Sequence, residues 1–138
     1  RLAGARVIGT GSATSADALR ALGAEPVAYG DGLAGRVRAL APAGVTAAID
    51  LYGTETAQAA RELSVPDERI TTIAAQVDGI TPANGANAAT GAIEEIARLV
   101  AAGQLRVPIA ASFPVEQIRA AVELQASRHV HGKVVIDL

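Results

Sequence analysis

Short apolar runs alternate with helical patterns along almost the whole chain. The apolar runs are rich in Val, Ile and Ala, and they predict strands at residues 6–10, 26–29, 47–51, 69–75, 107–112 and 133–138. Between them, apolar residues recur at helical spacing, which predicts helices at residues 15–22, 33–40, 54–63, 92–102 and 115–122. Strands that alternate with helices of this length favour βαβ units and a parallel sheet. We therefore predict an α/β fold.

Residues 77–91 interrupt this alternation. Gly, Asn, Thr, Ala and Pro crowd the segment, which is typical of a long loop or of a boundary between substructures. We therefore expect two parts, residues 1–91 and residues 92–138. At the start of the chain, Leu2-Ala3-Gly4-Ala5 is typical of a helix end with a Gly stop, so we expect residues before Arg1. A cleaved tag or a trimmed disordered terminus explains the same start.

The composition of the 138 residues excludes several classes of protein. Twelve basic and fourteen acidic residues give a net charge of −2, and only three residues are aromatic, so we expect no nucleic-acid partner. The absence of Cys excludes disulfides, thiolate zinc sites and Cys nucleophiles. The longest apolar runs fall far short of the roughly 20 residues that a membrane span needs. We expect a soluble, cytoplasmic protein with no membrane partner.

A glycine-rich turn follows the first predicted strand, in the sequence Gly9-Thr10-Gly11-Ser12-Ala13-Thr14. The spacing G-x-G-x-x-G of a dinucleotide fingerprint fails, because Thr14 stands where the third Gly would be. We interpret the turn as the end of the second strand of such a fold, where NAD-selective proteins carry an acid for the ribose 2′-hydroxyl. Ser12, Thr14 and Ser15 offer hydroxyls without charge there, which admits a 2′-phosphate. A plain turn with an N-cap at Thr14 or Ser15 explains the same residues.

Two further turns lie at predicted strand ends, Asp50-Leu51-Tyr52-Gly53-Thr54 and Ala74-Ala75. Ligands of open α/β sheets gather at such carboxyl ends, so these turns suit a cofactor, although a tight βα turn explains each of them as well. Near the end of the chain, Arg128 lies in a small basic cluster, which fits either a phosphate clamp or a solvated helix end. His129 and His131 lack a third metal ligand, so we expect no metal site.

These patterns occur in a familiar order. They are Val7-Ile8-Gly9-Thr10-Gly11-Ser12, Leu19-Arg20-Ala21-Leu22-Gly23-Ala24, Val27-Ala28-Tyr29, Asp50-Leu51-Tyr52-Gly53, Ile73-Ala74-Ala75, residues 96–105, Phe113-Pro114 and Gly132-Lys133-Val134-Val135. In this order and spacing the sequence resembles the medium-chain dehydrogenases/reductases, and most closely their zinc-free NADPH:quinone oxidoreductase-like branch. The resemblance covers essentially the whole chain.

The resemblance implies an incomplete Rossmann-like fold, with a doubly wound, mainly parallel sheet and a C-terminal helix-strand-helix-strand return. Residues 1–91 would be a partial NADP-binding segment from its second strand onward, with a degenerate sixth strand in residues 77–87. Residues 92–138 would be the return that packs on the family's catalytic domain. The first Rossmann strand, its glycine loop and that N-terminal catalytic domain would be missing from a fragment of this kind. The first strand is central in the order 3-2-1-4-5-6, so the strands at 6–10 and 47–51 would lose their shared neighbour. Another piece or copy would supply it, or the sheet would close differently.

The resemblance also implies a function and a set of site residues. The whole protein would be an NADPH-dependent oxidoreductase that transfers hydride to a quinone or an activated enone or carbonyl, and this chain alone would be inactive. The expected partners are that small-molecule substrate, the missing N-terminal part of the same protein and a second copy in a homodimer. The alternative is a non-enzymatic α/β module for regulation or interaction. No catalytic residue is expected in this chain, and the implied cofactor-binding residues are Ser12 and Thr14 near the 2′-phosphate, Tyr29 in the phosphate and adenine pocket, Gly53 and Ala74 at turns along the cofactor, and Arg128 reaching the 2′-phosphate. Many relatives carry a Lys or Arg where this chain has Thr14, Ser15 and Asp17, which leaves Arg128 as the main charged donor.

Overall fold

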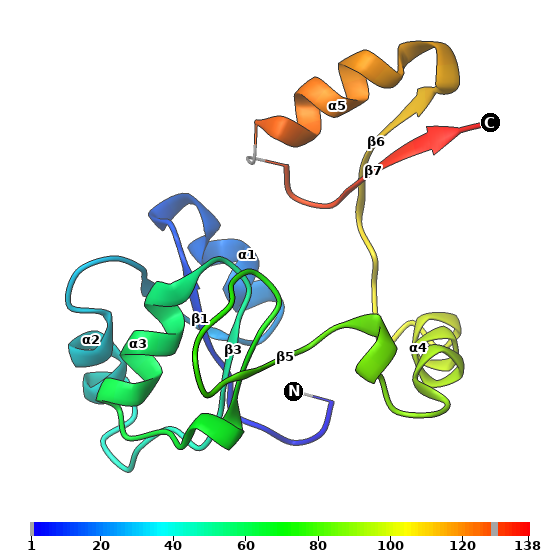
Figure 1. Cartoon of the computed structure of the whole chain (residues 1–138). Helices are drawn as coiled ribbons and strands as arrows, with labels where there is room; N and C mark the ends of the chain where they lie inside the picture. Colours follow the sequence, from blue (N-terminus) through cyan, green and yellow to red (C-terminus); the bar gives the residue numbers. More distant parts are fainter. Residues whose placement is uncertain (1, 128–129) are drawn as a thin grey trace. The chain divides into compact units, whose positions relative to one another are not determined.

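The computed structural model describes residues 2–127 and 130–138, and it divides the chain into two compact units, residues 1–88 and residues 89–138 (Figure 1). The first unit holds the strands β1 (Ile8–Gly11), β2 (Glu25–Ala28), β3 (Ala48–Asp50), β4 (Ile70–Thr72) and β5 (Thr81–Pro82), and the helices α1 (Ala16–Ala21), α2 (Leu33–Leu40) and α3 (Thr54–Glu62). The second unit holds α4 (Ala92–Ala101), β6 (Ile109–Pro114), α5 (Ile118–Ala126) and β7 (Lys133–Asp137). Short 3-10 turns lie at residues 13–15, 67–69, 85–87 and 115–117.

Every strand pair within the described residues is parallel. β1 pairs with β2, β3 pairs with β4, β4 pairs with the short β5, and β6 pairs with β7. The predicted α/β fold with parallel strands is therefore confirmed. The series α4, β6, α5 and β7 is the predicted helix-strand-helix-strand return. β5 lies inside residues 77–87, where the resemblance implied a degenerate strand.

Helices cover both sides of the β1-β2 sheet, and α2 and α3 lie on the opposite side from α1 (Figure 1). On the α1 side, a Cβ atom added to Gly9 or to Gly11 would lie 3.0 Å from Leu19 of α1, so glycine permits this close packing. On the other side, Val27 of β2 is buried against apolar residues of α2 and against Ala59 of α3. Apolar residues of the three helices therefore pack on the two faces of the β1-β2 sheet.

The second apolar cluster lies between α3 and the strands β3 and β4. Its buried members are Ala57, Ala60, Val65, Ile70 and Ile80. The partly buried residues Val45 and Leu63 contact both this cluster and the cluster around Val27. The two clusters thus form one continuous apolar layer beneath α2 and α3.

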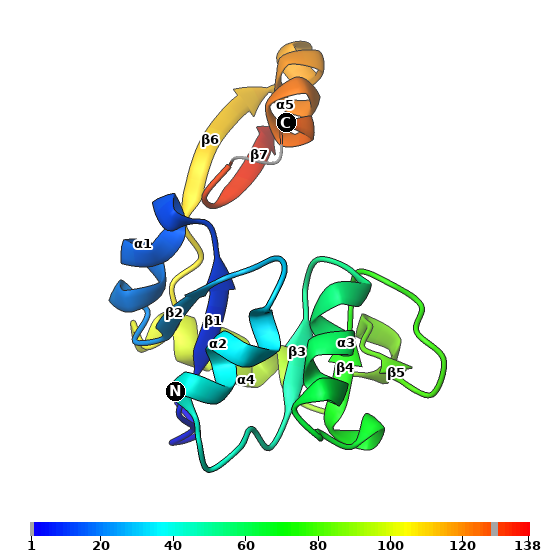
Figure 2. The same cartoon turned by 90° about the vertical axis from the view of Figure 1, so that its left-hand side faces the viewer.

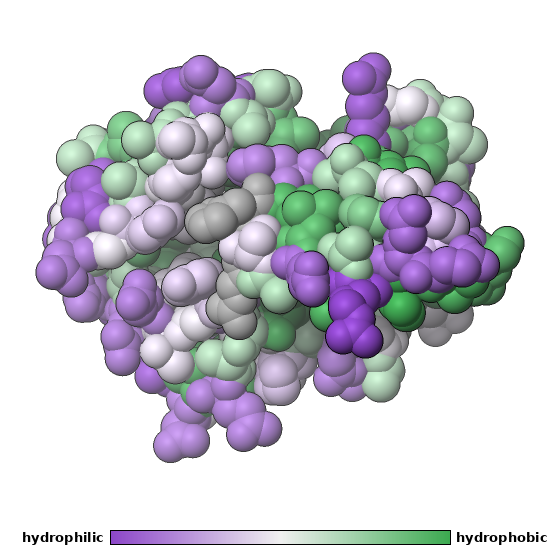
Figure 3. Space-filling model, turned by 90° about the horizontal axis from the view of Figure 1, so that it is seen from above, coloured by the Kyte–Doolittle hydropathy of each residue, from purple (hydrophilic) through white to green (hydrophobic). Residues whose placement is uncertain are grey.

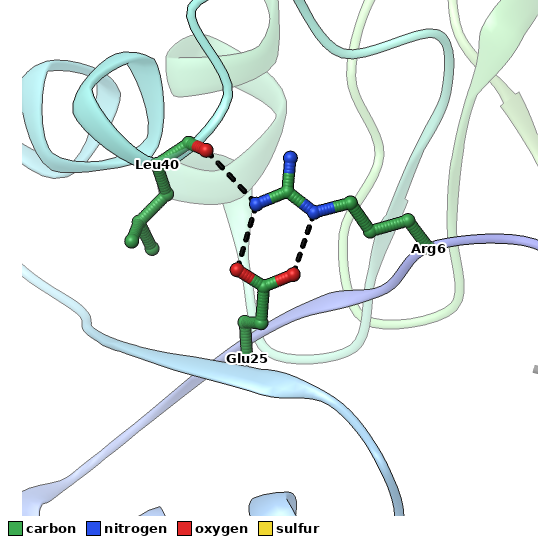
Figure 4. Close-up of polar contacts among 3 residues, drawn as sticks. All are labelled: Arg6, Glu25 and Leu40. Atoms are coloured by element: carbon green, nitrogen blue, oxygen red, sulfur yellow. Dashed lines mark hydrogen bonds and ion pairs between the residues drawn. The ribbon is translucent and has the colours of Figure 1, made fainter.

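An ion pair joins the amino ends of β1 and β2 to the end of α2 (Figure 4). The Arg6 guanidinium donates from Nε to Glu25 Oε1 at 2.5 Å and from a terminal nitrogen to Glu25 Oε2 at 2.7 Å. The same terminal nitrogen donates to the carbonyl oxygen of Leu40 at 2.9 Å. The hydrogen bond from Arg6 holds the pKa of Glu25 below its usual value. A cation also suits the carboxyl end of a helix, where carbonyl groups lack intrahelical partners.

β1 and β3 do not pair with each other, although both belong to the first unit. The described strands form three separate sheets, with the orders β1-β2, β3-β4-β5 and β6-β7. Figure 2 shows β1 and β3 as strands of two distinct sheets, with α2 and α3 nearby. This is the arrangement expected if the strand that both would share is absent from residues 2–127 and 130–138.

Apolar side chains remain exposed in both units, and some are visible as green surface in Figure 3. In the first unit, Ile49 is 65% exposed and Ile73 is 62% exposed. In the second unit, the predicted apolar stripe of α4 is present, but Ile93 is 77% exposed. Within the described residues, each helix is too short or too polar to span a bilayer.

Ile70 gives a direct test of the apolar layer. The side chain of Ile70 is 3% exposed, so Ile70→Ala should lower the free energy of unfolding by about 2–4 kcal/mol, because it removes buried methyl groups and leaves a cavity. The matched control, Ile73→Ala, lies just beyond the same strand on the exposed side and should change it by less than about 0.5 kcal/mol. Urea denaturation measures both values, and equal losses would contradict this packing.

Candidate functional site

The loops that follow β1, β2, β3 and β4 contain five of the six residues predicted to bind a cofactor. Ser12 and Thr14 follow β1, Tyr29 follows β2, Gly53 follows β3, and Ala74 lies two residues after β4. All of them belong to the first unit. Arg128, the sixth, and His129 lie outside the described residues. The carboxyl ends of parallel strands are where open α/β sheets bind ligands.

Three hydroxyl groups gather after β1. Ser12 Oγ lies 2.7 Å from Thr14 Oγ1 and 3.0 Å from Ser15 Oγ. Ser15 occupies the N-cap position of α1, but its side chain makes no capping hydrogen bond. The alternative interpretation, a turn with an N-cap at Thr14 or Ser15, is therefore confirmed for the position of Ser15, but the Ser15 hydroxyl bonds to Ser12 and not to the backbone of the helix. The resulting cluster, Ser12, Thr14 and Ser15, can both donate and accept hydrogen bonds.

Tyr29 leaves β2 at the same end of the β1-β2 sheet at which the hydroxyl cluster leaves β1. Gly11 and Ala28 are paired residues of β1 and β2, so Ser12 and Tyr29 are the next residues along two neighbouring strands. The Tyr29 side chain is 60% exposed. An exposed ring beside uncharged hydroxyls can cover the flat face of a ligand while the hydroxyls bind its polar groups.

Asp50 and Thr72 organise the other two turns, and our sequence analysis did not identify them as a pair. Both side chains are fully buried at the ends of β3 and β4. Thr72 Oγ1 donates to Asp50 Oδ2 at 2.6 Å, across neighbouring strands. Such a contact between residues far apart in the sequence depends on strand register, and the only sequence signal was a polar residue at the end of each apolar strand.

This buried pair takes up the backbone donors of both turns. Asp50 Oδ1 accepts from the N–H groups of Tyr52 at 3.1 Å and Gly53 at 2.9 Å. Thr72 Oγ1 accepts from the N–H groups of Ala74 and Ala75, both at 3.1 Å. One carboxylate and one hydroxyl therefore fix the turns that contain Gly53 and Ala74.

The charge of Asp50 is stabilised by these contacts. Burial raises the pKa of Asp50, but hydrogen bonds from Thr72, Gly53, Tyr52 and Thr56 outweigh it, and the net pKa lies below the usual value. Hydrogen bonds to the charged form of a carboxyl have this effect. Asp50 is therefore an ionised structural anchor at neutral pH.

The described residues fit no metal ion. Among residues 2–127 and 130–138, no group of three or more His, Cys, Asp or Glu side chains could hold one. Gly53, in contrast, has open space around it, because an added Cβ atom would meet nothing within 4 Å. The turn after β3 therefore allows a ligand to approach the backbone closely.

The lowered pKa of Asp50 predicts that the folded chain loses stability in acid. The pKa of Asp50 is lower in the folded chain than in the unfolded chain, where it is about 3.9. The ionised carboxylate therefore contributes fully to the free energy of unfolding above about pH 4. This contribution is lost as the pH falls through the lower pKa of the folded chain. Unfolding by urea at pH 7 and pH 3 should show a smaller acid loss for Asp50→Asn than for the wild type. Asp17→Asn, at a side chain that is 97% exposed, should keep the wild-type loss. An undiminished acid loss in Asp50→Asn would contradict this account.

Comparison with solved structures identifies the architecture. A crystal structure of an NAD-dependent alcohol dehydrogenase superposes with a TM-score of 0.79 and 26% identity, over 99% of this chain and 45% of that one. A probable oxidoreductase from Mycobacterium abscessus gives a TM-score of 0.74 and 26% identity, over 98% of this chain and 47% of that one. A crystal structure of a CurK enoyl reductase gives a TM-score of 0.76 and 21% identity, over 99% of this chain and 48% of that one. At this identity, the similarity shows the fold alone.

The predicted Rossmann-like fold class is confirmed by these superpositions. The chain spans less than half the length of each of these three structures. Among curated proteins, no sequence matches. The family of zinc-binding dehydrogenases matches residues 22–136. Because that match covers most of the sequence, this chain belongs to the zinc-binding dehydrogenase family.

Proposed function

We propose that this chain is the adenosine-binding part of an oxidoreductase that uses NADPH. The observation that carries the proposal is the uncharged hydroxyl cluster, in which Ser12 Oγ lies 2.7 Å from Thr14 Oγ1. It lies directly after β1, where the fold meets the adenosine ribose and where an NAD-selective site carries an acidic residue. Hydroxyls donate to phosphate oxygens, whereas a carboxylate would repel them. Arg128 belongs to the proposal as the charged donor to the same phosphate.

The rest of the nucleotide would follow the carboxyl ends of the strands. Tyr29 lies where it can cover the adenine, and Gly53 and Ala74 lie on the turns that Asp50 and Thr72 fix. A nicotinamide nucleotide supplies hydride chemistry when bound, so the residues of this chain need only bind and orient it. None of the described residues therefore needs a catalytic role.

The substrate, the partners and the location belong to the same proposal. We propose a quinone or an activated enone or carbonyl as hydride acceptor, a homodimer formed through residues 77–87, and a cytoplasmic enzyme. The family name mentions zinc, but the chain has no Cys and the described residues offer no cluster that fits the ion. We therefore propose no role for zinc in this part of the protein. The name of the alcohol dehydrogenase neighbour mentions NAD, so both nucleotides have to be compared.

A titration of the full-length gene product with NADPH and NADH tests this proposal. NADPH should bind more tightly, and Ser12→Asp should weaken NADPH binding by about tenfold or more, because a carboxylate then faces the 2′-phosphate, while NADH binding is kept or improved. Arg128→Ala should also weaken NADPH binding selectively.

The matched control for Ser12→Asp is Thr46→Asp. Thr46 is exposed and precedes β3, at the amino ends of the strands, so the same added charge should leave both affinities unchanged. If neither nucleotide binds the wild type, the proposal fails and a non-enzymatic module becomes the better account. Equal effects of the two Asp variants would also contradict the proposed pocket.

The proposal includes a further segment of the same polypeptide, and the open edges of β1 and β3 support it. Glu25 donates its N–H to the carbonyl oxygen of Val7. In a parallel pair, every second residue of a strand directs its backbone N–H and C=O groups to the neighbouring strand. The backbone groups of Ile8 and Thr10 therefore point to the other edge of β1, away from β2. Ile73 donates to the carbonyl oxygen of Asp50, so Ile49 turns its backbone groups away from β4. Neither open edge pairs with another described strand.

One face beside these edges is also bare. Ala48 packs toward α3, so the neighbouring Ile49 points to the opposite face of β3 and is 65% exposed. Ile73 is 62% exposed just beyond β4. α1 lies on that side of the strands, but it packs on β1 and β2. A helix of about 10 residues would be enough to cover such a strip of sheet.

We propose that one strand and one helix from a segment before Arg1 fill both gaps. A strand between β1 and β3, followed by a helix leading into β1, makes a right-handed crossover when the helix lies on the same side as α1. That is the side on which Ile49 is exposed. Gly4 has a φ of +80°, which is the backbone conformation of a glycine that ends a helix.

Hydrogen exchange measured on single amides tests this segment. In residues 1–138 alone, the amides of Ile8, Thr10 and Ile49 should exchange at least about tenfold faster than those of Gly9 and Asp50, which face a neighbouring strand. In the full-length gene product, the first three should become as slow as the other two. Slow exchange at Ile8, Thr10 and Ile49 in the short chain would show that these edges are already paired, and it would overturn this part of the proposal.

A further inference from the structure

One side chain holds the loop that carries Tyr29. Arg36, in the second turn of α2, donates from Nε to the carbonyl oxygen of Ala28 at 3.0 Å. One terminal nitrogen donates to the carbonyl oxygens of Tyr29 at 3.1 Å and Gly30 at 3.0 Å. The other terminal nitrogen donates to the carbonyl oxygen of Asp31 at 2.6 Å. Four consecutive carbonyl groups therefore converge on one guanidinium.

Such convergence is unusual for a chain leaving a strand. Successive carbonyl groups of an extended chain point to alternate sides, so the backbone must turn sharply to bring four of them together. Gly30 and Gly32 make this turn possible, with φ values of +87° and +76°. Carbonyl oxygens that face one another repel, and the planar, positively charged fork of Arg36 compensates for that repulsion.

The position of the Tyr29 ring depends on this backbone. The ring is 60% exposed, so packing contributes little to its orientation. Its own carbonyl group and those of both flanking residues are bound by Arg36. Tyr29 and Ser12 of the hydroxyl cluster each follow directly after the last paired residues of β2 and β1, Ala28 and Gly11. The geometry of the loop therefore sets how the ring stands relative to those hydroxyls.

We propose that Arg36 is a positioning residue that preorganises the adenosine end of the nucleotide site. The inference rests on the proposed function, since it assigns the Tyr29 loop to adenosine binding. Arg36 itself points its donors into the loop and has no role in contacting the nucleotide. A loop that is already ordered loses less conformational freedom on binding, and this difference appears as affinity.

The chain offers a matched control on the same helix. Arg38 donates a single hydrogen bond, to the carbonyl oxygen of Glu62 at 3.0 Å, and it makes no contact with the Tyr29 loop among the described interactions. Arg36→Ala and Arg38→Ala therefore remove the same charge and the same side chain from α2. Arg36→Lys keeps the charge, but a lysine has three donors on one atom and cannot bind four carbonyl oxygens in a plane.

Binding of two nucleotide halves to the full-length gene product tests the inference. With 2′,5′-ADP as the probe, Arg36→Ala should bind about tenfold more weakly than the wild type, Arg36→Lys should be intermediate, and Arg38→Ala should stay within about twofold. With nicotinamide mononucleotide as the probe, all four proteins should bind alike. A similar loss for both probes in Arg36→Ala would indicate general damage to the fold and would overturn a positioning role.

A second readout does not depend on binding. The 138 residues contain two Tyr and no Trp, so in a Tyr52→Phe background Tyr29 is the only strong intrinsic fluorophore of this chain. The fluorescence anisotropy of Tyr29 should fall in Arg36→Ala, because the loop gains freedom, and it should not change in Arg38→Ala. Unchanged anisotropy in Arg36→Ala would overturn the inference. If the wild type binds no 2′,5′-ADP while the anisotropy falls as expected, the proposed function fails and the structural role of Arg36 remains.

Discussion

The backbone of a central strand must form hydrogen bonds on both of its edges, and within the part of the chain that the structure describes β1 and β3 each pair along only one edge. The first unit is therefore held together by its helices and by side chains. Val45 and Leu63 join the two apolar clusters beneath α2 and α3. Arg6 adds a polar connection, because it binds Glu25 at the start of β2 and the carbonyl oxygen of Leu40 at the end of α2. The strands keep a common direction even though their sheet is interrupted.

The turns at the carboxyl ends of the strands differ in what they offer a ligand. After β3 and β4, the N–H groups of Tyr52, Gly53 and Ala74 are already bound by Asp50 and Thr72. These three N–H groups are therefore not free to bind a phosphate. After β1, the hydroxyl cluster around Ser12 has donors that can rotate toward an anion. The distribution of free donors therefore favours a phosphate in the loop after β1 over the turns after β3 and β4.

Sequence periodicity predicts the order of strands and helices, because the residues buried against a neighbouring layer are apolar and recur with the period of the strand or helix. It also locates the loops that hold Ser12, Tyr29, Gly53 and Ala74, since polar and small residues follow each apolar run. Their role in binding a cofactor stays a prediction, and Arg128 lies outside the described residues. The Asp50–Thr72 pair was beyond reach, because it depends on the register between β3 and β4. Arg36 was missed because a basic residue on an exposed helix is ordinary, and only the fold of residues 28–31 gives it four partners.

The central claim is that the carboxyl ends of β1 and β2 bind the adenosine phosphate of a nicotinamide nucleotide. The most direct measurement is the shift of backbone amide NMR signals in the full-length gene product as 2′,5′-ADP is added. The account predicts saturable shifts at Ser12, Thr14 and Tyr29, and none at Thr46 on the amino side of β3. Shifts centred on the amino ends of the strands, or no saturable shift at Ser12, would contradict it.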